Sequence, residues 1–413
     1  MAALLGCLLS VLAALPAWAA QDEKKKDDPG NLPPAVSQGL SYLLERVDQR
    51  GAEFDPAAVG PLLDFITSGA YDVDELRPPG LERTSSACGR YEIDASLSRI
   101  LEYFYNPSIP AFAMVPSVLR ASSWQPLSDI LTVARDLHSR VGTTEEPQLF
   151  WGKEYETTTP DSFGGAYYTY AMDRLLILMR HNGRNVFLSV TRQDGKSDVG
   201  RKGAIVDNDD WLYFYSGIEG LDRGLIGWMD TYMYASFSVM AFVENDSGGT
   251  VQMLFKWLRA GWAGINVVKT EHMHEGMDRM DKAFRSLLEN PALPPAEQVA
   301  RRMEYIQALP EEDLYRYIRE YSNAFEAAAK DVESMDKSSF QDIIENGRYY
   351  EVLDPEYQTC VLMKEYLKKA LGKPYLVDIT FPEDIALEPV AEPAPQSAPD
   401  ANATAPGPDA AAG

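Results

Sequence analysis

Apolar, strand-prone segments that follow one another with only short turns between them dominate the middle of this chain. Residues 175–179 and 186–190 flank the tetrapeptide His181-Asn182-Gly183-Arg184. Asn-Gly between two apolar runs is the strongest short-range signal for a β-hairpin, because both residues tolerate positive φ. Further candidate strands occupy residues 211–215, 232–243 and 250–258. Since strands joined by short turns pair antiparallel, the pattern predicts an antiparallel sheet.

A single long helix is expected after the last strand, over residues 270–288. Its apolar side chains recur at steps of four, three, four and three residues and are Met273, Met277, Met280, Phe284 and Leu287. This spacing places them on one face of the helix. Asn290-Pro291 ends it, because the residue before a proline avoids helical geometry.

The strand-rich region opens with a shorter pattern of the same kind. Tyr91, Ile93 and Ala95 alternate with polar neighbours, as in a half-buried strand. The next apolar side chains have helical spacing and are Leu97, Ile100, Leu101 and Phe104. A proline-spaced stretch and another candidate strand at 118–124 follow.

Two stretches of this region resemble the START-like, polyketide-cyclase-like superfamily (SRPBCC), which has a helix-grip fold. That family's opening strand, helix and proline-bearing loop resemble RYEIDASLSRILEYFYNPSIPAFAMVPSVLRASSW at 90–124. Its final strand and closing helix resemble TVQMLFKWLRAGWAGINVVKTEHMHEGMDRMDKAFRSLLEN at 250–290. A helix-like segment expected near 128–140 is an insertion in the family pattern. The resemblance implies an apolar cavity between sheet and helix, and so a hydrophobic small molecule or lipid as ligand.

The predicted fold class is α+β: a curved antiparallel sheet gripping a long C-terminal helix, with flanking N- and C-terminal helical segments. We expect an N-terminal helical segment at 34–75, a START-like domain at 84–290 and a second helical segment at 293–372. The clearest helices of the last segment are predicted at 297–309, 311–332 and 358–371.

The two ends of the chain predict export. Residues 1–20 are apolar and end in small residues, and Ala17-Trp18-Ala19 fits a signal-peptidase site. We therefore expect 1–19 to be a signal peptide and the protein to be periplasmic or secreted. A membrane helix is the alternative, although the run is short and broken at Pro16. Residues 20–33 predict a disordered tether, and the Ala/Pro-rich residues 385–413 a disordered tail.

Charge and composition exclude several classes of function. The chain has 62 acidic and 38 basic residues, a formal net charge of −24. Nucleic acids and anionic membranes attract clustered Lys and Arg, so binding to them through bulk charge is excluded. With four His and three Cys, we expect no cofactor and no metal. Glu271, His274 and Asp278 share a helix face that could hold a divalent cation, but a solvated face is the simpler interpretation.

The candidate ligand-binding residues are the methionine stripe and nearby aromatic rings. Methionines give a soft, adaptable lining for a flexible apolar ligand, or they fill an ordinary core. Tyrosine and tryptophan rings can orient a ligand head group, or they pack in the sheet. The candidates are Met273, Met277, Met280, Phe284, Tyr170, Tyr213 and Trp228.

Cys88 and Cys360 are the only cysteines that remain after the expected cleavage. An exported compartment permits a disulfide between them, and two unpaired buried thiols are the alternative.

Three functions stay open on the sequence alone. The first is an exported binding or carrier protein for a hydrophobic small molecule or lipid. The second is an enzyme in the same cavity, with polar groups such as Asp173, Arg174 or Tyr170. The third is a non-catalytic scaffold that holds an envelope protein partner through 293–372, which predicts an exposed apolar patch there.

Overall fold

The computed structural model describes residues 30–382 except Thr144, Phe163, 223–227 and Asp331. The predicted signal peptide and C-terminal tail lie outside these residues, as does the predicted tether up to residue 29. The described residues up to Ile379 form one compact unit. None of their helices is long and apolar enough to cross a membrane.

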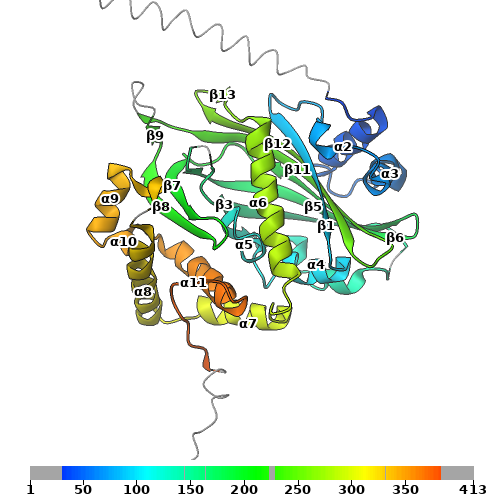
Figure 1. The fold of residues 1–413 in the computed structure, drawn as a ribbon. Helices are drawn as coiled ribbons and strands as arrows, with labels where there is room; N and C mark the ends of the chain where they lie inside the picture. The colour runs from blue at the N-terminus through cyan, green and yellow to red at the C-terminus, as the bar shows by residue number, and fades with distance from the viewer. Residues whose placement is uncertain (1–29, 144, 163, 223–227, 331, 383–413) are drawn as a thin grey trace, which may run out of the picture. The chain divides into compact units, whose positions relative to one another are not determined.

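An eight-stranded antiparallel sheet is the centre of the fold (Figure 1). Its strands are β1 (Ser85–Ile93), β2 (Leu119–Trp124), β3 (Gln148–Thr158), β5 (Thr169–His181), β6 (Arg184–Gln193), β11 (Tyr232–Glu244), β12 (Thr250–Trp262) and β13 (Ile265–Asn266). They lie in the order β1-β12-β11-β6-β5-β3-β2, and β13 pairs with the end of β12. The predicted hairpin is confirmed, because Asn182 and Gly183 turn between β5 and β6 with φ of 48° and 81°.

Two small sheets stand beside the main one. A three-stranded sheet contains β4 (Ala166–Tyr167), β7 (Arg201–Asp207) and β8 (Leu212–Glu219), and a two-stranded ribbon contains β9 (Leu221–Asp222) and β10 (Trp228–Met229). The strand predicted at 211–215 therefore belongs to a small sheet, not to the main one.

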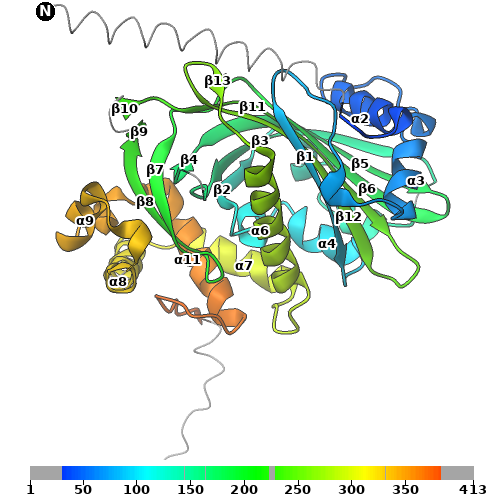
Figure 2. The ribbon, with the colours of Figure 1, turned by 45° about the horizontal axis from the view of Figure 1, so that its top comes forward.

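Each face of the main sheet carries helices (Figure 2). The outer face is covered by α2 (Pro34–Arg46) and α3 (Gly60–Ser68). The inner face carries α4 (Leu97–Phe104), α5 (Ala111–Met114) and the long α6 (Thr270–Leu288), whose bounds match the prediction. Neighbouring residues of a strand point to opposite faces, so each strand contributes to both layers. The structure is thus α+β, with a large antiparallel sheet and flanking helices, an arrangement compatible with a helix-grip fold.

The C-terminal helices pack against β2 and the three-stranded sheet. They are α7 (Ala296–Gln307), α8 (Glu311–Ala329), α9 (Ser338–Glu345), α10 (Tyr349–Val352) and α11 (Pro355–Ala370). Phe214 of β8 is fully buried among their rings, with Phe340 and Tyr349 at centroid distances of 4.8 and 5.1 Å. Helix α11 contacts β2 through Tyr357, whose ring centroid lies 3.7 Å from the guanidinium of Arg120 in β2.

The helix expected near 128–140 is wrong, because this segment contains only the 3-10 turns Asp129–Leu131 and Leu137–Arg140. The carboxylate of Asp129 accepts the backbone N–H of Trp151 at 2.8 Å, which ties the first turn to β3. Strand β3 itself was not predicted. Its inner-face positions include Gly152, Glu154 and Glu156, so the hydrophobic alternation that marks a strand is absent.

Of the two states left open for Cys88 and Cys360, the structure has the second: both thiols are buried and free, and no disulfide joins them. Cys88 lies in β1, at one edge of the sheet, within the core under α2 and α3. Cys360 lies in α11, which packs near β2 at the other edge of the strand order. Burial raises the thiol pKa of Cys88 to about 12 and that of Cys360 to about 11.

Candidate functional site

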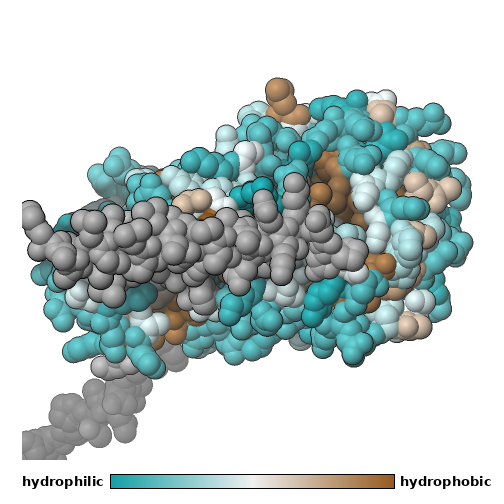
Figure 3. All heavy atoms as spheres, turned by 90° about the horizontal axis from the view of Figure 1, so that it is seen from above, coloured by the Kyte–Doolittle hydropathy of each residue, from teal (hydrophilic) through white to brown (hydrophobic). Residues whose placement is uncertain are grey.

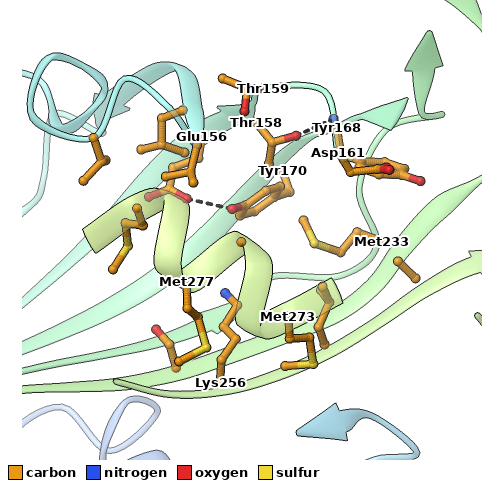
Figure 4. Close-up of a pocket in the computed structure, with 18 of the residues that line it drawn as sticks. Glu156, Thr158, Thr159, Asp161, Tyr168, Tyr170, Met233, Lys256, Met273 and Met277 are labelled. Carbon is orange, nitrogen blue, oxygen red and sulfur yellow. Dashed lines mark hydrogen bonds between the residues drawn. The ribbon is translucent and has the colours of Figure 1, made fainter. Parts of the chain in front are cut away.

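A cavity of about 360 Å³ lies between the inner face of the main sheet and α6 (Figure 4). Helix α6 contributes Met273, Gly276, Met277 and Met280 to its wall. The predicted methionine stripe therefore faces an open space for most of its length. Phe284 is the exception: it packs against Phe104 at a centroid distance of 4.9 Å and does not line the cavity.

The floor of the cavity is a row of polar side chains that crosses four strands. Lys256 of β12 pairs with Ser238 of β11, Ser238 with Thr191 of β6, and Thr191 with Arg174 of β5. Directly opposite residues share a face, so all four project from the inner face, and all four line the cavity. We call these residues the polar row. A polar floor beneath an apolar wall is typical of sites that orient a ligand.

Arg174 is the centre of a buried ion-pair cluster. Its Nη2 lies 2.9 Å from Glu154 Oε2 and 3.2 Å from Glu156 Oε1, and its Nη1 donates to Ser189 Oγ at 2.8 Å. Burial and the neighbouring Glu156 raise the pKa of Glu154 to about 7, although Arg174 opposes the shift. A carboxyl group with this pKa can exchange a proton near neutral pH.

Tyr170 extends the cluster into the cavity. Its hydroxyl donates to Glu156 Oε2 at 2.7 Å, the contact drawn as a dashed line in Figure 4. Burial, together with the charge of Glu156, raises the pKa of Tyr170 well above its usual value. Tyr170 therefore stays protonated and keeps Glu156 in place.

Lys256 carries the second basic group of the polar row. Its Nζ donates to Ser236 Oγ at 2.8 Å, and Figure 4 shows the side chain extending from β12 into the cavity. Burial lowers the pKa of Lys256, and the nearby Arg174 lowers it further while Glu156 raises it.

The exposed Asp161 and Ser162 mark the rim of the cavity. The carboxylate of Asp161 accepts the N–H groups of Gly165 and Ala166 at 3.3 and 3.2 Å, which shapes the loop before β4. Ser162 Oγ donates to Glu275 Oε2 at 2.8 Å and so links this loop to α6.

Tyr213, one of the predicted aromatic residues, does not line this cavity. Tyr213 belongs to β8, where its hydroxyl donates to Asn208 Oδ1 at 2.8 Å. The carbonyl oxygen of Ser117 lies 3.3 Å from the same hydroxyl and shares its single proton as the more distant acceptor. Trp228 lies in β10, and its side chain is outside the described part of the structure.

The polar residues proposed for an enzyme lie on different faces of the main sheet. Arg174 and Tyr170 line the cavity, whereas Asp173 points to the outer face and lies 3.5 Å from Lys153. Asp278 accepts the hydroxyl of Tyr91 at 3.1 Å. No group of His, Cys, Asp and Glu side chains within the described residues could hold a metal ion.

Glu154, Glu156 and Lys256 are charged site residues that the sequence interpretation missed, together with Ser238 and Thr191 of the polar row. Glu154 and Glu156 lie in the unpredicted β3. Lys256 lies in the apolar run MLFKWL, and a lone charge inside a buried strand was the available signal.

The sequence matches no protein-family model and no curated protein. The cavity and its chemistry therefore carry the functional argument.

Proposed function

We propose that the protein is an exported binding or carrier protein that holds a hydrophobic small molecule or lipid between the sheet and α6. The observation that carries this proposal is the cavity of about 360 Å³. Protein interiors are close-packed, and few of their voids exceed a water molecule. A space of this size with an apolar wall and a polar floor fits a ligand. Membership of the START-like superfamily is part of the proposal, and the sequence resemblance at 90–124 and 250–290 supports it.

The first experiment is native mass spectrometry of the purified chain, followed by solvent extraction and identification of any bound molecule. A stoichiometric apolar or amphipathic molecule is the expected result. An apo mass that stays unchanged after incubation with a lipid extract would contradict the proposal.

Gly276→Phe provides a matched structural test. A Cβ built on Gly276 would meet no atom within 4 Å, and the position lines the cavity, so a phenyl ring there should fill ligand space. Ligand affinity should fall at least about tenfold, or ~1.4 kcal/mol. Thermal stability should not fall, because glycine inside a helix costs about 0.5–1 kcal/mol.

Glu271→Phe is the control, since Glu271 lies on the exposed face of the same helix. It should leave binding unchanged. Equal loss of ligand in both variants would mean that the ligand does not occupy this cavity.

An enzyme in the same cavity is the second candidate, and the near-neutral pKa of Glu154 beside Tyr170 favours it. If the extracted molecule is turned over, Glu154→Gln should abolish turnover without abolishing binding. The scaffold alternative has less support. Within the described part of 293–372, Tyr315 is the only large hydrophobic residue that is strongly exposed. Figure 3 shows the molecule from above, the side away from most of the helices in this segment, and its atoms there are mostly hydrophilic, with hydrophobic atoms in separate areas.

A further inference from the structure

The charged side chains in the inner part of the cavity do not all compensate one another. Arg174 pairs with Glu154 and Glu156, and Glu156 also accepts the hydroxyl of Tyr170. The Lys256 ammonium, in contrast, forms no ion pair with any described residue, and its hydrogen-bond acceptor is the Ser236 hydroxyl at 2.8 Å. An ammonium group has three hydrogens to donate, so Lys256 has donor capacity left toward the cavity.

Arg279 of α6 is a second cation on the cavity wall. Its Nη2 donates to the carbonyl of Ser117 at 2.6 Å and to Thr159 Oγ1 at 2.9 Å. These partners are neutral, and Arg279 likewise forms no ion pair with a described residue. The wall of the cavity thus presents two cations that neutral oxygens solvate.

The charge balance favours an anion near Lys256. With Glu154 protonated, the Arg174–Glu154–Glu156 cluster is neutral, so nothing in the cluster compensates the charge of Lys256. Burying an uncompensated ammonium is costly, and a carboxylate or phosphate oxygen stabilises it through a charge-assisted hydrogen bond. An amine would instead meet a protonated Glu154 and the carboxylate of Glu156, whose two oxygens already accept from Arg174 and Tyr170.

The volume limits the size of the ligand. Small-molecule sites span roughly 300–1,000 Å³, so a space of about 360 Å³ is at the lower end of that range. A ligand with one alkyl chain of about ten to twelve carbons therefore suits it better than a ligand with two long chains.

We propose that the cavity takes a single-chain amphiphile with an anionic head group, which pairs with Lys256 while the chain lies against Met273 and Met277. This assignment rests on the proposed function of the cavity and names its ligand class. The head group is a carboxylate or a phosphate monoester, since either supplies the anionic oxygens that Lys256 can bind.

The test compares four probes of equal chain length on the full chain, below the pKa of Glu154: dodecanoate, dodecyl phosphate, dodecanol and dodecylamine. Isothermal titration calorimetry gives the affinities. At least one anionic probe should bind about tenfold or more tightly than dodecanol, and dodecylamine should bind weakest. The two anionic probes distinguish a carboxylate ligand from a phosphate ligand.

Lys256→Met should remove the preference for the anionic probe, and Lys256→Arg should keep it. Lys153→Met is the matched control, because Lys153 projects from the outer face of the same sheet and pairs with Asp194 at 2.6 Å. Circular dichroism checks that each variant is folded.

The possible results distinguish a failure of this inference from a failure of the proposed ligand-binding function. Tight binding of dodecanol without any preference for an anion, or a preference that survives Lys256→Met, would overturn the inference while the cavity still binds ligands. Failure of all four probes to bind would overturn the proposed function as well.

Discussion

Glu154 shows how one buried residue sets a pH dependence. Its pKa is raised from 4.5 to about 7 in the folded protein, mainly because burial penalises the charged carboxylate. Between these pH values the folded protein binds a proton that the unfolded chain releases. The contribution of Glu154 to stability is therefore present at low pH and is lost as the pH rises from about 4.5 to about 7.

Glu154→Gln should remove this dependence, because the amide does not titrate. Relative to the variant, the wild-type protein should lose up to about 3 kcal/mol of unfolding free energy as the pH rises from 4.5 to 7. Urea unfolding, followed by tryptophan fluorescence at several pH values, measures the unfolding free energy. The control is Glu145→Gln, which changes an exposed carboxyl group. Parallel pH profiles for wild type and Glu154→Gln would show that Glu154 is not the group responsible.

Helices α2 and α3 illustrate how an element contributes to stability without touching the site. Leu43, Leu63 and Ile66 are fully buried against outer-face residues of the sheet. The sheet separates them from the cavity, which opens on the inner face.

Leu43→Ala should therefore destabilise the protein by about 2–5 kcal/mol through loss of burial and formation of a void. Leu44→Ala, at a partly exposed neighbour, should cost clearly less. Ligand binding to the folded protein should persist in both variants, measured with the same titration as for wild type. A loss of affinity in Leu43→Ala would mean that the two faces are coupled.

Helices and strands could be predicted where a turn motif or the spacing of apolar residues within the segment determines them. Asn182-Gly183 identifies the β5–β6 hairpin through its φ values, and the stripe of Met273, Met277 and Met280 locates α6. The predicted helices at 297–309, 311–332 and 358–371 correspond to α7, α8 and α11, with ends that differ by a few residues. Helices α9 and α10 were missed, because they are short and lie among polar turns.

The polar row was not predictable in the same way. Lys256, Ser238, Thr191 and Arg174 lie in four different strands, and only the register between those strands brings them together. Strand β3 was not predicted for a related reason. Glu154 and Glu156 lie on its inner face and interrupt the hydrophobic alternation by which a strand is recognised in a sequence. A site assembled by tertiary pairing leaves no local spacing in the sequence.

At the scale of the whole molecule, α11 joins the C-terminal helices to the main sheet through a buried lysine amine. Lys364 of α11 donates to the carbonyls of Pro116 and Leu119 at 3.1 and 2.5 Å. Burial lowers the pKa of Lys364 from 10.5 to about 7. Between these values the unfolded chain binds a proton that the folded protein does not, so this residue makes stability rise with pH.

Lys364→Met should abolish that rise. The stability of the wild-type protein relative to the variant should increase by a few kcal/mol between about pH 7 and pH 10, and thermal unfolding at several pH values measures it. Lys369→Met removes an exposed ammonium from the same helix and should change stability by about 0.5 kcal/mol or less. A constant difference across this pH range would contradict the assignment.

The alternation of faces along the central strands has a consequence for how such a chain can diverge. In β12, Phe255 packs in the core on the outer face and Lys256 lines the cavity on the inner face, so two adjacent residues lie in different layers of the fold. A substitution at an inner-face position alters ligand preference while the outer core persists. Deletion of a single residue would instead exchange the two faces, forcing Lys256 among leucines and phenylalanines. Homologous chains should therefore vary in the identity of their cavity residues far more readily than in the length of these strands.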